Sequence, residues 1–223
     1  MQPVVLFDLD GTLVKSEEGI FKSIEYALGK MRYEGLENLE LRKFIGPPLF
    51  DSFTEYCHMT SDDANKTVAY YRERYSVTGM FEGELYPSVP AMLEALAAEG
   101  FTLAIASSKP EHYVDRIVEH FGIAGAFEHI VGASMDASRS SKKSVIAEAL
   151  RRLGADPAAG GIVMVGDKEH DIFGARAHGI PCIAVTYGYG TAEEFDAARP
   201  AARVDSPAEI VEAVQALANE PTT

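Results

Sequence analysis

Four short, uninterrupted apolar segments recur along the chain, and each has the length of a buried β-strand. They are Val4–Phe7, Leu103–Ala106, Ile162–Val165 and Ile183–Val185. Helical patterns separate them: Tyr113, Ile117 and Phe121 recur at a spacing of four, and Ile146, Ala149, Leu150 and Leu153 share one face. Continuous apolar strands that alternate with amphipathic helices are typical of a parallel sheet covered on both faces. The pattern therefore predicts an α/β fold.

The stretch from residue 15 to residue 82 differs, because it holds helical patterns and no convincing strand. Two apolar stripes run through it, formed by Ile20, Ile24, Ala27, Leu28 and Met31, and by Ala64, Val68, Tyr71 and Tyr75. We predict an inserted α-helical domain at 15–82, within a core domain made of 1–14 and 83–223. The turn Gly46-Pro47-Pro48 lies between the stripes. Two interpretations of Gly46 and Pro47 stay open: a substrate-facing loop of the insert, or a plain turn between helices.

Composition and charge narrow the class of protein. The chain has 223 residues, a hydrophobic share of 47% and a formal net charge of −14. No apolar run approaches the roughly 20 residues of a membrane helix, and the N-terminus lacks a secretory pattern. Cys57 and Cys182 lie far apart, in no metal-ligand spacing, which indicates two reduced thiols. We therefore expect a cytoplasmic protein with no membrane and no nucleic-acid partner, and the charge suits a monomer.

Polar residues follow the predicted strands directly. The first strand leads into Asp8-Leu9-Asp10-Gly11-Thr12, the second into Ser107-Ser108-Lys109-Pro110, and a later one into Gly166-Asp167-Lys168-Glu169-His170-Asp171. A helix that opens with Ser140-Ser141-Lys142-Lys143 lies between the last two. In an open α/β sheet, ligands bind beyond the carboxyl ends of the strands. The segments together supply the groups needed for metal-assisted phosphoryl transfer.

Each of these groups has a plausible chemical task. The Asp8 carboxylate directly follows a buried strand and suits a nucleophile that forms an aspartyl-phosphate. Asp10, two residues on, is close enough to protonate the leaving oxygen and later to deprotonate the attacking water. Ser107 and Lys142 are the candidates to hold the oxygens of the transferring phosphoryl group.

A carboxylate that meets a phosphate needs a hard cation between the two anions. Mg²⁺ prefers oxygen ligands, and Asp8, the carbonyl of Asp10 and Asp167 are the expected set. Asp171 is expected to orient this set or to ligate through water.

The segments resemble the signatures of the haloacid dehalogenase (HAD) superfamily. Asp8-Leu9-Asp10-Gly11-Thr12-Leu13 is similar to the first signature, and Ser107, Lys142 and Gly166-Asp167 with Asp171 match the other three in order. The resemblance covers nearly the whole chain and implies a Rossmann-like core, an aspartyl-phosphate intermediate, Mg²⁺ and a helical cap at the position of the insert. The register of the superfamily favours Lys142 over Lys143 as the phosphate ligand.

Within the superfamily, the second aspartate, Asp10, distinguishes this pattern from that of the dehalogenases and indicates a phosphatase. The four signatures are accompanied by two further segments, Phe44-Ile45-Gly46-Pro47-Pro48-Leu49 and Tyr187-Gly188-Tyr189-Gly190. Together they resemble the phosphoglycolate phosphatase-like and 5′-nucleotidase-like branch. We expect a small phosphorylated metabolite as the substrate, a nucleoside 5′-monophosphate first of all. The alternative substrates are phosphoglycolate and a sugar phosphate. The alternative to an enzyme is a catalytically silent binding protein with the same fold. Arg139 has two open interpretations, a substrate-phosphate ligand or a solvated loop residue.

Overall fold

The computed structural model describes residues 2–136 and 138–218. The chain divides into two compact units: a sheet unit of Met1–Lys15 and Leu85–Thr223, and a helical unit of Ser16–Glu84. These boundaries, 15/16 and 84/85, lie within two residues of the expected 14/15 and 82/83. Strands β2 (Val14–Lys15) and β3 (Glu84–Leu85) pair with each other in a two-stranded sheet. On the helical side, the carbonyl of Glu82 accepts from the Gly19 N–H at 3.0 Å and ties this segment to the helices.

The sheet unit is built on six strands in the order β5-β4-β1-β6-β7-β8, and all the pairings are parallel. The strands are β1 (Val4–Phe7), β4 (Thr102–Pro110), β5 (His129–Ala133), β6 (Ile162–Gly166), β7 (Cys182–Val185) and β8 (Ala202–Val204). The α/β expectation is confirmed. The four predicted strands form the interior of the sheet. The prediction omitted β5 and β8, which are its two edges.

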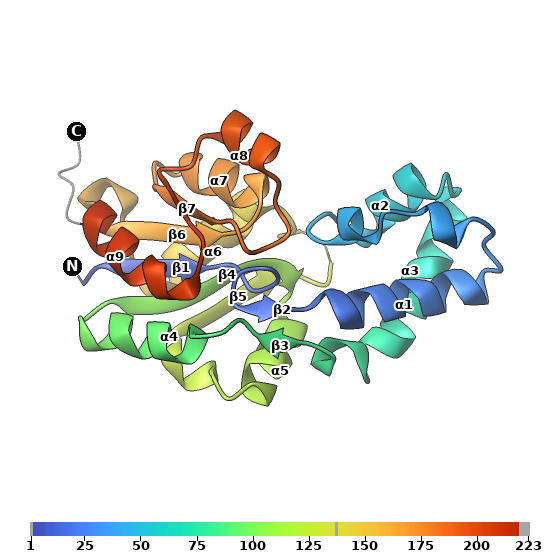
Figure 1. The fold of residues 1–223 in the computed structure, drawn as a ribbon, viewed down its shortest axis with the longest axis horizontal. Coiled ribbons are helices and arrows are strands. Elements are labelled where there is room, and N and C mark those ends of the chain that lie inside the picture. Colours follow the sequence, from blue (N-terminus) through green and yellow to red (C-terminus); the bar gives the residue numbers. More distant parts are fainter. Residues whose placement is uncertain (1, 137, 219–223) are drawn as a thin grey trace. The chain divides into compact units, whose positions relative to one another are not determined.

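Helices cover both faces of this sheet, with α4 on one side and α7 on the other (Figure 1). The elements of the unit are α4 (Val89–Ala98), α5 (Glu111–His120), α6 (Lys142–Leu153), α7 (Glu169–Arg176), α8 (Ala192–Ala198), α9 (Pro207–Ala218) and the 3-10 turns Ala124–Ala126 and Pro157–Ala159. Successive side chains of a strand point to opposite faces. Val4 and Leu6 accordingly share one core cluster with residues of α6 and α7, and all four residues of β1 are buried.

The helical unit contains α1 (Glu17–Lys30), α2 (Leu49–Tyr56), α3 (Ser61–Tyr75) and the 3-10 turns Leu36–Asn38, Leu41–Phe44 and Gly79–Phe81. Most of the two predicted apolar stripes are buried, among them Ile24 and Tyr75. Glycine allows α1 to approach the segment after α3, since a Cβ on Gly19 would lie 1.8 Å from the carbonyl oxygen of Gly79. An ion pair between Arg74 and Glu82, 2.7 Å long, holds the same segment.

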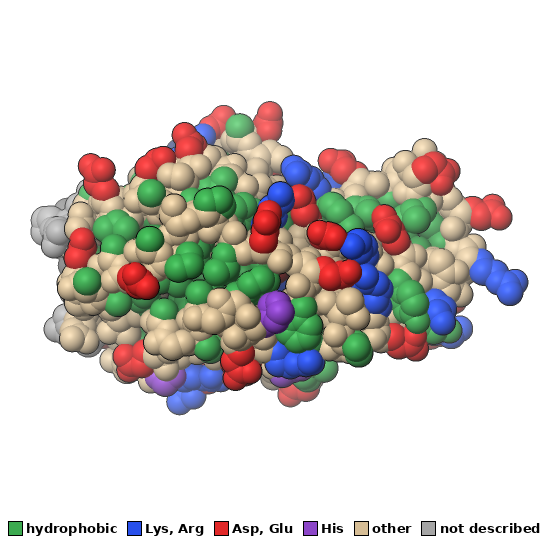
Figure 2. All heavy atoms as spheres, turned by 60° about the horizontal axis from the view of Figure 1, so that its bottom comes forward, with side chains coloured by type: hydrophobic (Ala, Val, Ile, Leu, Met, Phe, Trp, Pro, Cys, Tyr) green, Lys and Arg blue, Asp and Glu red, His purple; other side chains and the backbone are tan. Residues whose placement is uncertain are grey.

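The acidic side chains are distributed over the surface. Asp and Glu side chains are spread over the face that Figure 2 shows, among basic and apolar side chains. No helix in the described part of the chain is both long enough and apolar enough to cross a membrane. Both cysteines are buried as free thiols, Cys57 in the helical unit and Cys182 in the sheet unit.

Candidate active site

Several of the side chains singled out in the sheet unit meet at the carboxyl ends of its strands, namely Asp8, Lys142, Asp167 and Asp171. Asp8 comes directly after the central strand β1, and its N–H donates to the Val165 carbonyl of β6 at 2.9 Å. This bond extends the ladder of the sheet by one residue, so the backbone of Asp8 is held as firmly as the strand itself. The Asp8 side chain is 14% exposed.

Lys142 is the central cation of this cluster. Its Nζ lies 2.8 Å from Asp8 Oδ1, 2.8 Å from Asp171 Oδ1, and donates to the carbonyl of Ala106 at 2.9 Å. The neighbouring Lys143 is exposed. The stem of Lys142 crosses α7 at Gly174, where a Cβ would lie 2.7 Å from its Cγ. The structure thus brings Lys142, and not Lys143, to the candidate nucleophile.

Burial and charge oppose each other at Lys142. Burial by itself lowers the pKa of an ammonium group, but the carboxylates of Asp171 and Asp8 outweigh it and raise the pKa of Lys142 above its ordinary value. Lys142 therefore stays charged at neutral pH. It can offset negative charge beside Asp8 in every protonation state relevant to a reaction there.

Three carboxylates crowd together beside this lysine. Asp8, Asp167 and Asp171 each offer an oxygen, and these oxygens lie within 4.8 Å of one another. Burial, followed by repulsion from Asp171 and Asp8, raises the pKa of Asp167 well above its usual range. Burial also raises the pKa of Asp171, against the opposing influence of Lys142. A buried group of carboxylates with raised pKa values is a place where a cation is stabilised.

The residues present fit Mg²⁺. The donors are carboxylate oxygens, the ligands that this hard cation prefers. With all groups ionised, the carboxylates of Asp8, Asp10, Asp167 and Asp171 exceed the ammonium groups of their partners Lys109 and Lys142 by two charges. A divalent cation would balance this excess.

The loop after β7 closes around Asp167. The Tyr189 N–H donates to Asp167 Oδ2 at 2.8 Å. The glycines on either side of Tyr189 leave no room for a side chain, since a Cβ on Gly188 would lie 2.4 Å from Asp167 Cβ and one on Gly190 2.1 Å from the Asp167 carbonyl oxygen. From the sequence, Tyr187-Gly188-Tyr189-Gly190 indicated only a family resemblance. The alternating glycines were the available signal that this loop packs against a site residue.

Gly11, in the turn that follows Asp10, combines a positive φ with a close approach to a site residue. Its φ is +79°, and a Cβ there would lie 2.1 Å from Asp167 Oδ2. We expect Gly11→Ala to cost about 1–3 kcal/mol in the free energy of unfolding and to lower kcat/KM at least about tenfold by displacing the carboxylate. Thermal unfolding and phosphate-release kinetics measure the two effects. Gly125→Ala is the matched control, since a Cβ on Gly125 meets open space. Unchanged kinetics in Gly11→Ala would contradict the expectation.

Asp10 has a partner that the sequence did not indicate. Its Oδ2 lies 2.7 Å from the Nζ of Lys109, and both side chains are largely buried. The backbone of Lys109 contributes as well, because its N–H donates to Ser107 Oγ at 3.3 Å. Ser107 itself is 2% exposed at the same strand end.

The remaining candidates lie in other surroundings. The Arg139 guanidinium pairs with Glu111 at 2.9 Å and its Nε donates to the Gly132 carbonyl at 2.8 Å. Arg139 is thus engaged with the protein itself, which neither earlier interpretation described. Gly46 and Pro47 belong to the helical unit, in the bend before α2, where Gly46 has a φ of 107°. That value explains the glycine as a turn residue.

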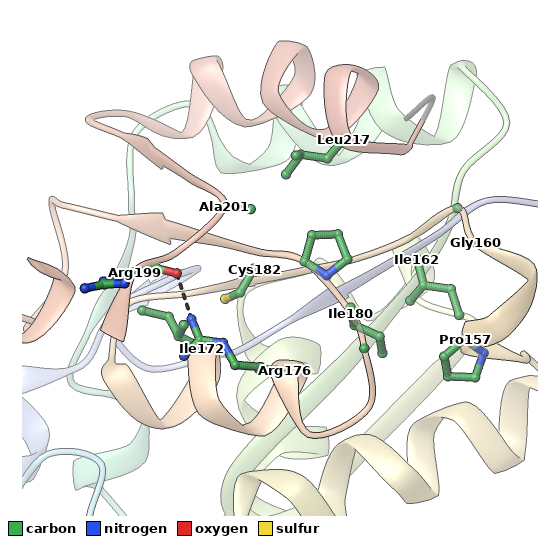
Figure 3. Close-up of a pocket in the computed structure, with 13 residues that line it drawn as sticks. Pro157, Gly160, Ile162, Ile172, Arg176, Ile180, Cys182, Arg199, Ala201 and Leu217 are labelled. Carbon is green, nitrogen blue, oxygen red and sulfur yellow. Dashed lines mark hydrogen bonds between the residues drawn. The ribbon is translucent and has the colours of Figure 1, made fainter. Parts of the chain in front are cut away.

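The opposite end of the same sheet has a different character. A cavity of about 470 Å³ lies where β6 and β7 begin, lined by residues that include Ile162, Ile180 and Cys182 (Figure 3). Arg176, one of its lining residues, donates to the carbonyls of Ala198 and Arg199 and so links the end of α7 to the end of α8. The lining mixes aliphatic side chains with glycines and the arginines Arg176 and Arg199. The cluster of carboxylates around Lys142 lies at the carboxyl edge instead.

The parallel sheet and the aspartate–lysine cluster at its carboxyl edge are those of an α/β phosphotransfer enzyme. Residues 5–185 match the family model described as haloacid dehalogenase-like hydrolase. The chain belongs to this family, and it is a phosphatase within it.

Relatives of known name carry several activities. A 5′-nucleotidase of Pseudomonas aeruginosa is 38% identical over 198 residues, which are 89% of each chain. A phosphoglycolate phosphatase of Vibrio parahaemolyticus is 30% identical over 95% of each chain. The tyrosine-protein kinase PtkA of Mycobacterium tuberculosis is 39% identical over 86% of this chain and 65% of its own.

A solved structure confirms the expected HAD-type Rossmann-like fold. The crystal structure of a predicted phosphatase from Clostridium acetobutylicum superposes with a TM-score of 0.89 at 40% identity, and the match covers 97% of this chain and 100% of that one. The similarity extends over both units of the chain and is not limited to the sheet.

Proposed function

We propose that this phosphatase hydrolyses nucleoside 5′-monophosphates through an aspartyl-phosphate on Asp8, with Mg²⁺ as its cofactor. The observation that carries the proposal is the surroundings of Asp8. Its Oδ1 lies 2.8 Å from the Lys142 ammonium, beside the carboxylates of Asp167 and Asp171. A rigid carboxylate at a strand end, next to a fixed cation and a candidate metal site, is suited to attack phosphorus.

The first half of the reaction transfers the phosphoryl group to the protein. A carboxylate oxygen of Asp8 forms a bond to phosphorus while the bond from phosphorus to the ester oxygen breaks. Asp10 gives its proton to the departing oxygen, which leaves as an alcohol. Ser107 and Lys142 bind the equatorial oxygens of the phosphoryl group, and the charge of Lys142 offsets the negative charge that accumulates there.

The second half returns Asp8 to its starting state. A water molecule attacks the phosphorus of the aspartyl-phosphate while the bond from phosphorus to the Asp8 oxygen breaks, Asp10 takes a proton from that water, and inorganic phosphate departs. Asp10 therefore serves as acid and then as base at one position. Neither half needs an oxidant or a second substrate besides water.

Asp8, Asp167 and the carbonyl of Asp10 are the proposed Mg²⁺ ligands, with Asp171 in support. When bound, the cation supplies charge neutralisation between the carboxylates and the substrate phosphate. Asp171 has a second task in this arrangement. Its Oδ2 accepts the N–H of Lys168 at 3.0 Å, and its Oδ1 faces Lys142, so it holds the lysine in position.

The nucleotide preference rests on the 5′-nucleotidase relative, which is more similar to this chain than the phosphoglycolate phosphatase is. A panel of the four ribonucleoside 5′-monophosphates, phosphoglycolate and glucose 6-phosphate tests it by phosphate release. We expect kcat/KM for at least one nucleotide to exceed that for phosphoglycolate by about tenfold or more.

A preference for phosphoglycolate or for the sugar phosphate would contradict the proposed substrate and leave the phosphatase class intact. Transfer of phosphate from ATP to a tyrosine peptide forms a separate arm of the panel, because one relative carries the name of a kinase. Transfer there without phosphate release from any monoester would contradict the proposal as a whole.

A further inference from the structure

The carboxylate of Asp10 is held on one side only. Its Oδ2 lies 2.7 Å from the Lys109 Nζ, with side-chain exposures of 15% for Asp10 and 8% for Lys109. Among the described residues, its Oδ1 is buried and has no hydrogen-bond partner. A buried carboxylate oxygen without a partner is costly. The two oxygens of Asp10 are therefore not equivalent: Oδ2 is paired with Lys109 and Oδ1 is enclosed, so the ion pair fixes the orientation of the whole carboxylate.

The fold places Lys109 by a local irregularity of β4. The pairing of β4 with β5 shifts register between Ala106 and Pro110, and Lys109 lies within this interval. Gly132 of β5 makes room for it, because a Cβ there would lie 2.5 Å from the Lys109 carbonyl oxygen. Glu111 stabilises the contact between β4 and β5 at this point, since its carboxylate accepts the Gly132 N–H at 3.2 Å. The position of the ammonium thus depends on a packed backbone and not on a free loop.

We propose that Lys109 is a positioning residue for proton transfer by Asp10. Its ammonium holds Oδ2 and thereby fixes the orientation in which the Asp10 carboxylate gives a proton to the leaving oxygen and takes one back from the attacking water. The inference rests on the proposed function and deepens it, since it assigns the orientation of the acid–base group to a residue outside the four signatures. Lys109 itself forms and breaks no covalent bond.

The leaving group decides how much this orientation matters. An alkoxide, such as the 5′ oxygen of a nucleoside, is a poor leaving group and needs a proton as the bond to phosphorus breaks. A nitrophenolate is a good leaving group and departs without one. The quantity kcat/KM covers the steps up to transfer of the phosphoryl group to Asp8 and thus reports this proton. Loss of the orientation should affect kcat/KM for alkyl phosphates and spare that for nitrophenyl phosphate.

The variants are Lys109→Met, which keeps the length of the side chain without its charge, and Lys109→Arg, which keeps the charge. For Lys109→Met we expect kcat/KM on the preferred nucleoside monophosphate to fall about 100-fold, since general acid–base catalysis contributes that much or more. The value for p-nitrophenyl phosphate should stay within about threefold. Lys109→Arg should recover a substantial part of the loss. Lys143→Met, an exposed lysine on the first turn of α6, is the matched control and should leave both values unchanged.

A double-mutant cycle gives the second measurement. Asp10→Asn alone should show the same dependence on the leaving group, and adding Lys109→Met to it should change kcat/KM by less than about threefold, because two residues that act as a unit are not additive. An equal loss on both substrates, or full additivity with Asp10→Asn, would overturn the inference. If the unmodified protein releases phosphate from neither substrate, it is the proposed function that fails.

Discussion

Asp8→Asn is expected to abolish Mg²⁺-dependent phosphate release, with a fall in kcat on the order of 10⁴-fold or more. An amide oxygen is a far weaker nucleophile toward phosphorus than a carboxylate, and the substitution also removes the negative charge that faces Lys142 at 2.8 Å. The geometry of the site should change little, because Asn has nearly the shape of Asp and the Asp8 backbone is held by β6.

Two measurements check this expectation. The rate of phosphate release from a nucleoside monophosphate and from p-nitrophenyl phosphate should fall together, since both need the same nucleophile. Acid quenching during turnover should trap a phosphorylated peptide containing Asp8 in the unmodified protein and none in the variant. Asp196→Asn serves as the control, because Asp196 is an exposed residue that pairs with Arg203 at the surface, and such pairs contribute little. If Asp8→Asn retains about a hundredth of the activity or more, Asp8 is not the nucleophile.

The sheet shows where a sequence pattern is informative and where it fails. Val4–Phe7 lies at the centre of the sheet, covered on both faces, so all its side chains are apolar and the strand is evident. His129–Ala133 and Ala202–Val204 are edge strands, and their residues include a histidine, an arginine and a glycine. An edge strand has a neighbour on one side only and tolerates polar and small residues. Its pattern therefore does not separate it from a loop.

The site shows the same contrast between local and distant causes. Asp8 and Asp167 could be proposed because each directly follows an evident strand, and strand ends of a parallel sheet meet at one edge. The pairing of Lys109 with Asp10 depends on a register shift in β4 that a glycine of β5 permits. No pattern within the segment around Lys109 encodes this contact, because its cause lies on another strand.

Asp167→Asn is expected to have two opposite effects, one on stability and one on function. Asp167 is 1% exposed, and burial together with Asp171 and Asp8 raises its pKa in the folded protein. A carboxyl group whose pKa is raised on folding destabilises the protein as the pH rises above the pKa of the unfolded chain, about 4. At neutral pH and without metal, the neutral amide should therefore raise the unfolding temperature by a few degrees, roughly 2–4 °C for each kcal/mol gained. The amide oxygen can still accept the Tyr189 N–H that Asp167 Oδ2 now receives.

The gain should disappear when Mg²⁺ is added, because a cation that binds only the folded protein stabilises it in proportion to its affinity. The unmodified protein should unfold at a higher temperature in MgCl₂ than in EDTA, while Asp167→Asn should respond weakly and lose activity by about 100-fold or more. Unfolding scans of both proteins in the two buffers measure these shifts, with Asp196→Asn as the control.

A variant less stable than the unmodified protein in EDTA would show that the carboxylates do not repel one another there. An undiminished response to Mg²⁺ would show that Asp167 is not a ligand. We expect Asp167→Asn to be more stable than the unmodified protein in EDTA and to respond less to Mg²⁺. This combination identifies a carboxylate whose role is to bind a cation. If Asp167 served packing instead, its substitution would destabilise the protein in both buffers.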